Sequence, residues 1–161
     1  MGGEPRIQRG KVVAIDGHQS NPPCVASGMA VVSRIERMKI RVLIVEDDAL
    51  IALGHQMAVR ELGAIPVGIA DSYRGALELA RSQNPHVALV DMRLRDGLTG
   101  NDVALSLHSN LRVLPIFLTA NPAYVSPEAK AICLALIPKP IPSATLAAAL
   151  RAAAAAIDTQ I

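Results

Sequence analysis

Aromatic side chains are nearly absent from this chain of 161 residues, which has no tryptophan, two tyrosines and one phenylalanine. A surface that stacks the bases of single-stranded nucleic acid needs several aromatic rings, so the scarcity argues against that class of binding site. Apolar residues nevertheless make up 51% of the chain and charged residues only 19%, which excludes a disordered chain. The core is therefore expected to be aliphatic, built from alanine, leucine, isoleucine and valine.

Cysteines and long apolar runs are also scarce. Cys24 and Cys133 do not make a disulfide framework, and no group of cysteines and histidines has metal-ligand spacing. The longest apolar candidate, residues 144–157, is interrupted by Arg151 and falls short of the roughly 18 residues that a membrane span needs. The beginning of the chain lacks the continuous apolar region of a secretory signal. We therefore expect a cytoplasmic protein without membrane insertion.

The positive charge of the chain is confined to its beginning. The formal net charge is +2, and residues 1–38 hold five basic and three acidic side chains, whereas residues 39–161 hold eleven of each sign. Glycine and proline interrupt every apolar run within residues 1–38. We expect this segment to be a poorly ordered or non-native N-terminal extension, and residues 39–161 to be the folded domain. Direct binding to nucleic acid is not expected of a domain without excess positive charge.

Short apolar runs alternate with helical patterns after residue 39, which predicts an α/β fold with a parallel sheet and helices on both faces. The expected strands cover residues 40–45, 64–70, 86–90, 113–118 and 132–137. The expected helices cover residues 49–62, 72–83, 101–109 and 142–157, with one further turn after Ser126. Pro66 places the second strand at an edge of the sheet. In the first helix, the side expected to face the core carries Leu50, Leu53, Met57, Val59 and Leu62.

Polar residues stand where the expected strands end. Glu46 and Asp47 follow the first strand, Asp91 the third, Thr119 the fourth and Lys139 the fifth. The carboxyl ends of parallel strands share one edge of the sheet, so these side chains are expected to meet. Three carboxylates brought together repel one another unless a cation neutralises them, and Mg²⁺ prefers such oxygen ligands.

The same set suits phosphoryl transfer. Asp91 is the natural nucleophile because a carboxylate can form an aspartyl phosphate, while Lys139 and Thr119 offer donors to phosphoryl oxygens. Taken singly, each residue would more often be a cap, a turn residue or a solvated side chain. It is the combination at four strand ends that favours the functional interpretation.

The motifs around these residues resemble the receiver domain of two-component response regulators, the CheY-like family. They comprise Val42–Asp48, Leu89–Leu94, Asp96–Gly100, Phe117–Ala120 and Pro138–Pro140. The resemblance covers residues 39–161 and implies a flavodoxin-like, doubly wound sheet of five parallel strands in the order 2-1-3-4-5. It also implies a stand-alone signalling receiver whose own chemistry is limited to self-phosphorylation and self-dephosphorylation.

The resemblance further implies a role for each site residue. Asp91 would accept a phosphoryl group from a sensor histidine kinase or a histidine phosphotransfer protein, and Thr119 and Lys139 would contact that group. Mg²⁺ would be held by Glu46, Asp47, Asp91 and the backbone carbonyl of Arg93. The phosphorylated chain would then act on a downstream protein target or form a homodimer.

One departure from the family pattern and one rival enzyme class keep alternatives open. Leu136 stands where the family often has an aromatic residue that moves together with Thr119, so a degenerate receiver acting as a constitutive interaction module is one alternative. A phosphatase of the haloacid-dehalogenase type also uses a strand-end aspartate, but it usually needs a second aspartate where this chain has Arg93. A dinucleotide-binding enzyme is disfavoured because no glycine-rich loop follows the first strand.

Overall fold

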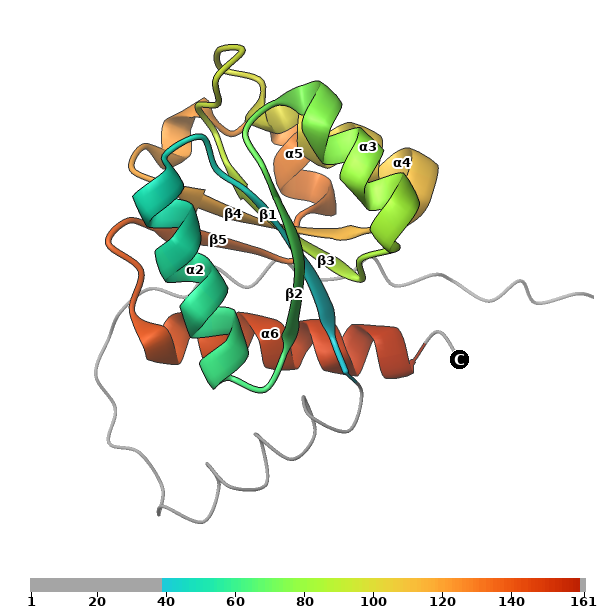
Figure 1. Cartoon of the computed structure of the whole chain (residues 1–161). Coiled ribbons are helices and arrows are strands. Elements are labelled where there is room, and N and C mark those ends of the chain that lie inside the picture. Colours follow the sequence, from blue (N-terminus) through green and yellow to red (C-terminus); the bar gives the residue numbers. More distant parts are fainter. Residues whose placement is uncertain (1–38, 160–161) are drawn as a thin grey trace, which may run out of the picture.

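Five parallel strands form the centre of the fold in the computed structural model, which describes residues 39–159 (Figure 1). They are β1 (Arg41–Val45), β2 (Ile65–Ala70), β3 (Val87–Asp91), β4 (Leu114–Thr119) and β5 (Ala135–Pro138). Their order, β2-β1-β3-β4-β5, confirms the expected doubly wound topology and places β2, which contains Pro66, at an edge. The expected N-terminal extension, residues 1–38, lies outside the described residues.

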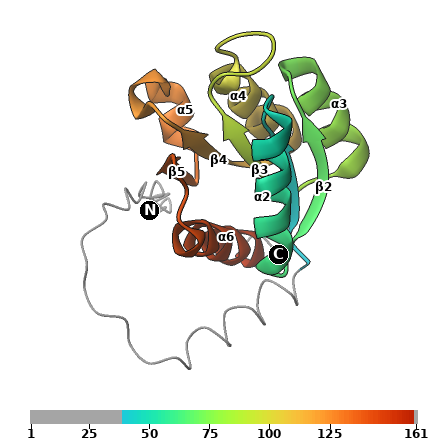
Figure 2. The same cartoon turned by 60° about the vertical axis from the view of Figure 1, so that its left-hand side comes forward.

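Helices cover both faces of this sheet (Figures 1 and 2). One face is packed by α2 (Ala49–Glu61) and α6 (Ser143–Asp158). The other face is packed by α3 (Tyr73–Gln83), α4 (Gly100–Leu111) and α5 (Pro127–Ile132), with a short 3₁₀ turn, η1 (Pro122–Tyr124), before α5. No helix within residues 39–159 is both long and apolar enough to cross a membrane.

The core is aliphatic, as the composition predicts. Residues along β1 alternate between the two faces, with Val42 and Ile44 packing toward α2 and α6 and Leu43 and Val45 packing toward α3 and α4. All four are buried, which explains why the strand is a continuous β-branched and leucine run rather than an alternating one. The single phenylalanine, Phe117, is fully buried on the α3–α5 side.

The predicted inward face of α2 is wrong for three of its five residues and correct for Val59 and Leu62, which pack in or against the core. Leu50, Leu53 and Met57 are 82%, 48% and 54% exposed, while the buried residues of the helix are Ala52 and Val59. The helix has no charged side chain before Arg60, so apolar residues occur around most of its circumference and do not mark the core-facing side. The small side chain of Ala52 allows α2 to lie close to the sheet.

The predicted start of the fifth strand is also wrong. Ile132 is the last residue of α5 and Cys133 is its C-terminal cap, so β5 begins only at Ala135. The cause lies upstream, because the Ser126 hydroxyl accepts a hydrogen bond from the Ala129 backbone N–H at 3.2 Å and starts a helix of six residues. That helix includes the first residue of the apolar run.

Candidate functional site

Three carboxylates gather at the carboxyl edge of the sheet. Glu46 and Asp47 follow β1, Asp91 is the last residue of β3, and one oxygen from each lies within 4.8 Å of the others. Asp48, the next residue, starts α2 by accepting hydrogen bonds from the Leu50 and Ile51 backbone N–H groups at 2.9 and 3.0 Å. This cap fixes the turn in which Glu46 and Asp47 lie.

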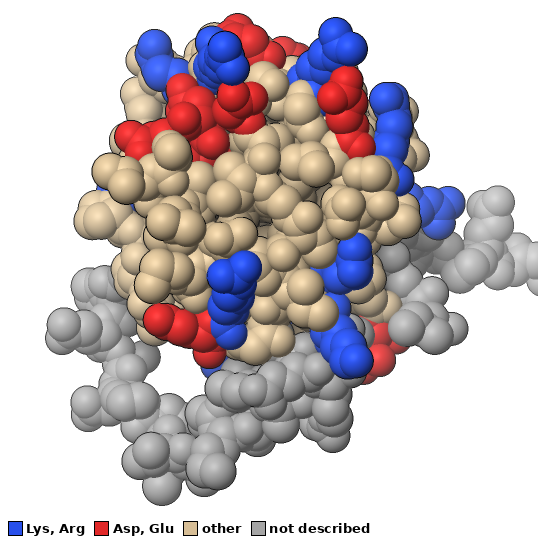
Figure 3. Space-filling model, viewed as in Figure 1, with Lys and Arg blue, Asp and Glu red and all other residues tan. Residues whose placement is uncertain are grey.

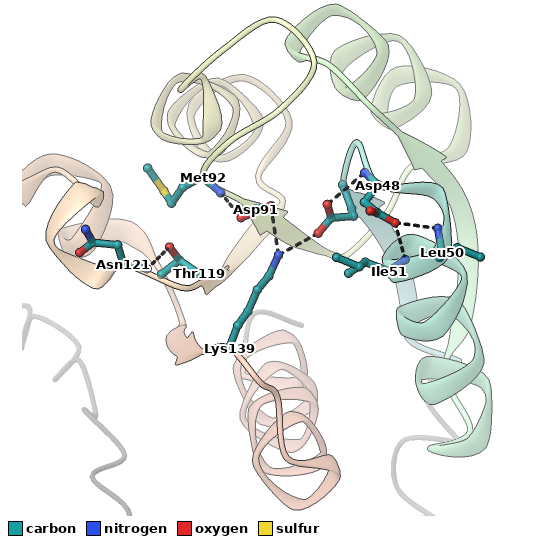
Figure 4. Close-up of polar contacts among 9 residues, drawn as sticks. Asp48, Leu50, Ile51, Asp91, Met92, Thr119, Asn121 and Lys139 are labelled. Atoms are coloured by element: carbon teal, nitrogen blue, oxygen red, sulfur yellow. Dashed lines mark hydrogen bonds and ion pairs between the residues drawn. The ribbon is translucent and has the colours of Figure 1, made fainter.

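Lys139 reaches into this group from the loop after β5. Its Nζ atom lies 3.0 Å from Glu46 Oε2 and 3.0 Å from Asp91 Oδ2 (Figure 4). The backbone N–H of Lys139 donates to the carbonyl of Thr119 at 2.9 Å, which ties the loop to the end of β4. One ammonium therefore bridges two carboxylates that are 45 residues apart in the sequence.

Burial and charge act against each other in this cluster. The Glu46 side chain is only 3% exposed, and burial raises its pKa although the hydrogen bond from Lys139 opposes the shift. Burial also disfavours the charge on Lys139, but its hydrogen bonds to Glu46 and Asp91 outweigh that effect and raise the pKa of the ammonium. Because the cluster groups three carboxylates and Lys139 pairs with two of them, it carries a surplus of negative charge that favours a cation.

The carboxylate of Asp91 is held from two sides. Its Oδ1 atom accepts a hydrogen bond of 2.7 Å from the Met92 backbone N–H, while Oδ2 faces Lys139.

Gly100, the first residue of α4, lies directly against this turn and donates its N–H to the Met92 carbonyl at 3.1 Å. A Cβ atom at Gly100 would stand 2.4 Å from the Asp91 carbonyl oxygen, so the close approach requires glycine.

The remaining predicted residues lie around this centre. Thr119 is buried at the end of β4, and its hydroxyl accepts a hydrogen bond from the Asn121 backbone N–H at 3.1 Å (Figure 4). Arg93 follows Met92 and its side chain is exposed, so it lies at the surface of the β3–α4 loop. Leu136, at the position where the related family often has an aromatic residue, is partly buried and packs against the core on the α3–α5 side.

The donor set fits a hard divalent cation such as Mg²⁺. Glu46, Asp47 and Asp91 offer only carboxylate oxygens, and one of the three side chains is buried, one partly buried and one exposed. Mg²⁺ prefers oxygen ligands, keeps several waters and is held by few protein carboxylates, which a partly open cluster allows.

Sequence reasoning missed three contributors to the site. The Met92 backbone N–H and the close approach of Gly100 hold the Asp91 turn, and neither leaves a side-chain signal in the sequence. His55 of α2 lines a groove that Lys139 also lines. A titratable side chain among the mostly apolar residues of this helix was the signal that could have identified it.

Comparison with known protein families agrees with this geometry. The sequence model described as the response regulator receiver domain matches residues 42–151, a range that contains Glu46, Asp47, Asp91, Thr119 and Lys139.

Individual relatives match only through part of their own length. The chain is 32% identical over 114 residues to the phyllosphere-induced regulator PhyR of Methylorubrum extorquens, which covers 70% of this chain and 43% of that protein. The crystal structure of the response regulator PhyR from Brucella abortus is similar with a TM-score of 0.70 and 30% identity, over 84% of this chain and 55% of that one. The crystal structure of a variant of the anti-anti-sigma factor PhyR from Bartonella quintana is similar with a TM-score of 0.72 and 26% identity, over 84% of this chain and 55% of that one. The chain thus spans about half the length of these relatives.

Proposed function

Since the chain belongs to the response regulator receiver family, a family of signalling proteins rather than classical enzymes, we propose that it accepts a phosphoryl group on Asp91. The observation that carries the proposal is the Asp91 carboxylate at the end of β3, with Oδ1 held by the Met92 N–H and Oδ2 held by Lys139. The donor is a phosphohistidine of a sensor kinase or phosphotransfer protein, and we place the reaction in the cytoplasm.

In the proposed reaction an Asp91 oxygen attacks the phosphorus of the phosphohistidine. The P–N bond breaks, the imidazole leaves, and an acyl phosphate forms on the aspartate. Lys139, already 3.0 Å from Asp91 Oδ2, pairs with the transferred group, and the hydroxyl of Thr119 donates to a phosphoryl oxygen. Glu46, Asp47, Asp91 and the Arg93 carbonyl would hold Mg²⁺, which would supply positive charge to offset the charge of the phosphoryl oxygens.

The exposed face of α2 offers a docking surface for the donor protein. Between the acidic residues before its start and Arg60 near its end, α2 carries no Lys, Arg, Asp or Glu, and Figure 3 shows an uncharged surface in this region. Leu50, Leu53 and Met57 are exposed on it, and Leu50 lies in the first turn of the helix, next to the acidic residues. A helix that presents the phosphohistidine with apolar neighbours would bury this face as it reaches Asp91.

Met57→Glu tests this docking surface. The substitution places a charge in the apolar face and is expected to slow phosphoryl transfer from a phosphorylated sensor kinase by about tenfold or more. Loading from acetyl phosphate, which needs no docking helix, is expected to stay unchanged. Equal loss with both donors, in radiolabel transfer assays, would contradict a role in docking.

Output from the phosphorylated state is proposed to pass through protein contact at α5, β5 and α6, toward a downstream protein or a second copy of the chain. Leu136 lies in β5 beside this surface and takes the place of the aromatic residue common in the family. The matched relatives include an anti-anti-sigma factor, but the chain covers only 55% of it, so the proposal extends to the phosphoacceptor part alone.

The deciding experiment loads the protein with acetyl phosphate or beryllofluoride in the presence of Mg²⁺ and measures its intact mass. One adduct per chain is expected. No adduct would favour the degenerate receiver, in which the fold acts as a constitutive interaction module. Sustained hydrolysis of p-nitrophenyl phosphate would instead favour a phosphatase of the haloacid-dehalogenase type.

A further inference from the structure

A groove of about 360 Å³ lies between α2 and the segment that connects β5 to α6. Its walls are mostly apolar, but Lys139 lines one end and His55 lines the α2 side. The other lining residues are uncharged and comprise Ile51, Gly54, Ala58, Pro140, Ile141, Ser143 and Leu146. The groove therefore connects an imidazole of α2 with the ammonium that holds Asp91.

The His55 ring is only partly buried, yet its Nε2 atom is shielded from solvent and has no hydrogen-bond partner among the described residues. A buried polar atom without a partner opposes folding, and an apolar side chain of similar size would fill this position at lower cost. Packing therefore does not account for an imidazole at this position.

Two charged groups influence this imidazole: Lys139, which lines the same groove, and Asp91, which Lys139 contacts at 3.0 Å. Burial lowers the pKa of His55, the Lys139 ammonium lowers it further, and the Asp91 carboxylate opposes both effects. The residues of α2 and α6 that line the groove beside the ring carry no charge. The two charged groups that shift the pKa of His55 are thus the ones that the proposed phosphoryl transfer uses.

We propose that His55 is a positioning residue that acts through Lys139: the two side chains line one groove, Lys139 holds Asp91 at 3.0 Å, and proton uptake by the imidazole is coupled to the charge carried at Asp91. This inference rests on the proposed function for its consequence but not for the coupling itself, which is a property of the unphosphorylated chain.

The coupling has a definite sign. A phosphoryl group on Asp91 adds negative charge and engages Lys139, and both changes favour a proton on His55. Because linkage is reciprocal, a proton on His55 favours the phosphorylated form, so lower pH should increase the affinity for a phosphoryl mimic. Without the imidazole this contribution is lost.

NMR titration of the imidazole rings in the unphosphorylated protein measures the coupling between the charge on Lys139 and the pKa of His55. In Lys139→Gln, the pKa of His55 is expected to rise relative to wild type because one nearby positive charge is gone. His86 is an internal control. It lies just before β3, at the end of the strands away from Asp91, and its pKa is lowered by burial and by Arg41. An unchanged His55 titration, or an equal shift of His86, would overturn the proposal.

The effect of His55 on phosphorylation is measured as the apparent affinity for beryllofluoride with saturating Mg²⁺. The measurement is made at about pH 5.5 and about pH 8, on either side of the ordinary histidine pKa of ~6.5. Relative to His55→Leu, wild type is expected to gain at least about twofold in affinity at the lower pH. Comparing the two proteins at each pH cancels the effect of pH on the probe. Equal pH dependence would contradict the proposal.

The two readouts separate the proposals. If no beryllofluoride binds at either pH while the His55 titration still responds to Lys139→Gln, the phosphoacceptor function fails and the coupling stands. If beryllofluoride binds but neither comparison shows a difference, the positioning role fails and the phosphoacceptor stands. Thermal unfolding of His55→Leu provides the folding control, and a melting temperature at or above that of wild type is expected because the unpartnered nitrogen is removed.

Discussion

Asp91→Asn is expected to give no mass adduct with acetyl phosphate and Mg²⁺, under conditions that load most of the wild-type chain. An amide oxygen is a far weaker nucleophile than a carboxylate, and the substitution also removes one of the three carboxylates grouped at the site. Lys139 also contacts Glu46, at 3.0 Å, and this substitution leaves that partner in place, so the loop after β5 is expected to keep an anchor. The loss is therefore expected in chemistry and not in folding.

Asp102→Asn is the matched control. Asp102 is an exposed carboxylate in the first turn of α4, away from Lys139, and its substitution changes the net charge of the protein by the same amount. This control is expected to load like wild type. An adduct that persists in Asp91→Asn would place the phosphoryl group on another residue and contradict the proposed acceptor. Melting temperatures of all three proteins show whether any loss arises from unfolding.

Much of the site was accessible from the sequence because it lies where chain geometry is most constrained. Parallel strands must end at one edge of the sheet, so Glu46, Asp91 and Lys139 could be expected to meet without knowledge of any side-chain conformation. The structure adds which atoms face each other, for example that Lys139 bridges Glu46 and Asp91. Which oxygen pairs with which donor depends on loop geometry that apolar periodicity does not report.

The failures have a physical cause as well. Periodicity identifies the buried side of a helix only when the opposite side is polar, and α2 is apolar on most sides, so Leu53 and Met57 were assigned to the core although they are exposed. Their exposure makes them available to the proposed docking surface. The sequence does not single out His55, because each of the four scattered histidines is more often a surface or structural residue than a ligand.

The close approach of Gly100 to the Asp91 turn leads to the largest expected effect on stability. A Cβ atom there would lie 2.4 Å from the Asp91 carbonyl oxygen and 2.6 Å from Met92 Cα, both backbone atoms that cannot move aside as a flexible side chain would. Gly100→Ala is therefore expected to lower the free energy of unfolding by about 3 kcal/mol, or the melting temperature by about 10 °C. Because the displaced turn carries Asp91, phosphorylation of the remaining folded protein should also slow.

Gly54→Ala is the matched substitution for this comparison. Gly54 lies within α2, and a Cβ atom there would meet nothing within 4 Å. Alanine costs less backbone entropy than glycine in a helix, so this variant is expected to gain about 0.5–1 kcal/mol. Denaturant unfolding of both variants measures whether each substitution raises or lowers the free energy of unfolding. A loss of stability in both would mean that the cost comes from changing glycine itself, and a neutral Gly100→Ala would mean that the β3–α4 turn can move away from the sheet edge. Opposite signs would show that the packing of α4 against the Asp91 turn, not helix propensity, determines the conformation of the phosphoacceptor.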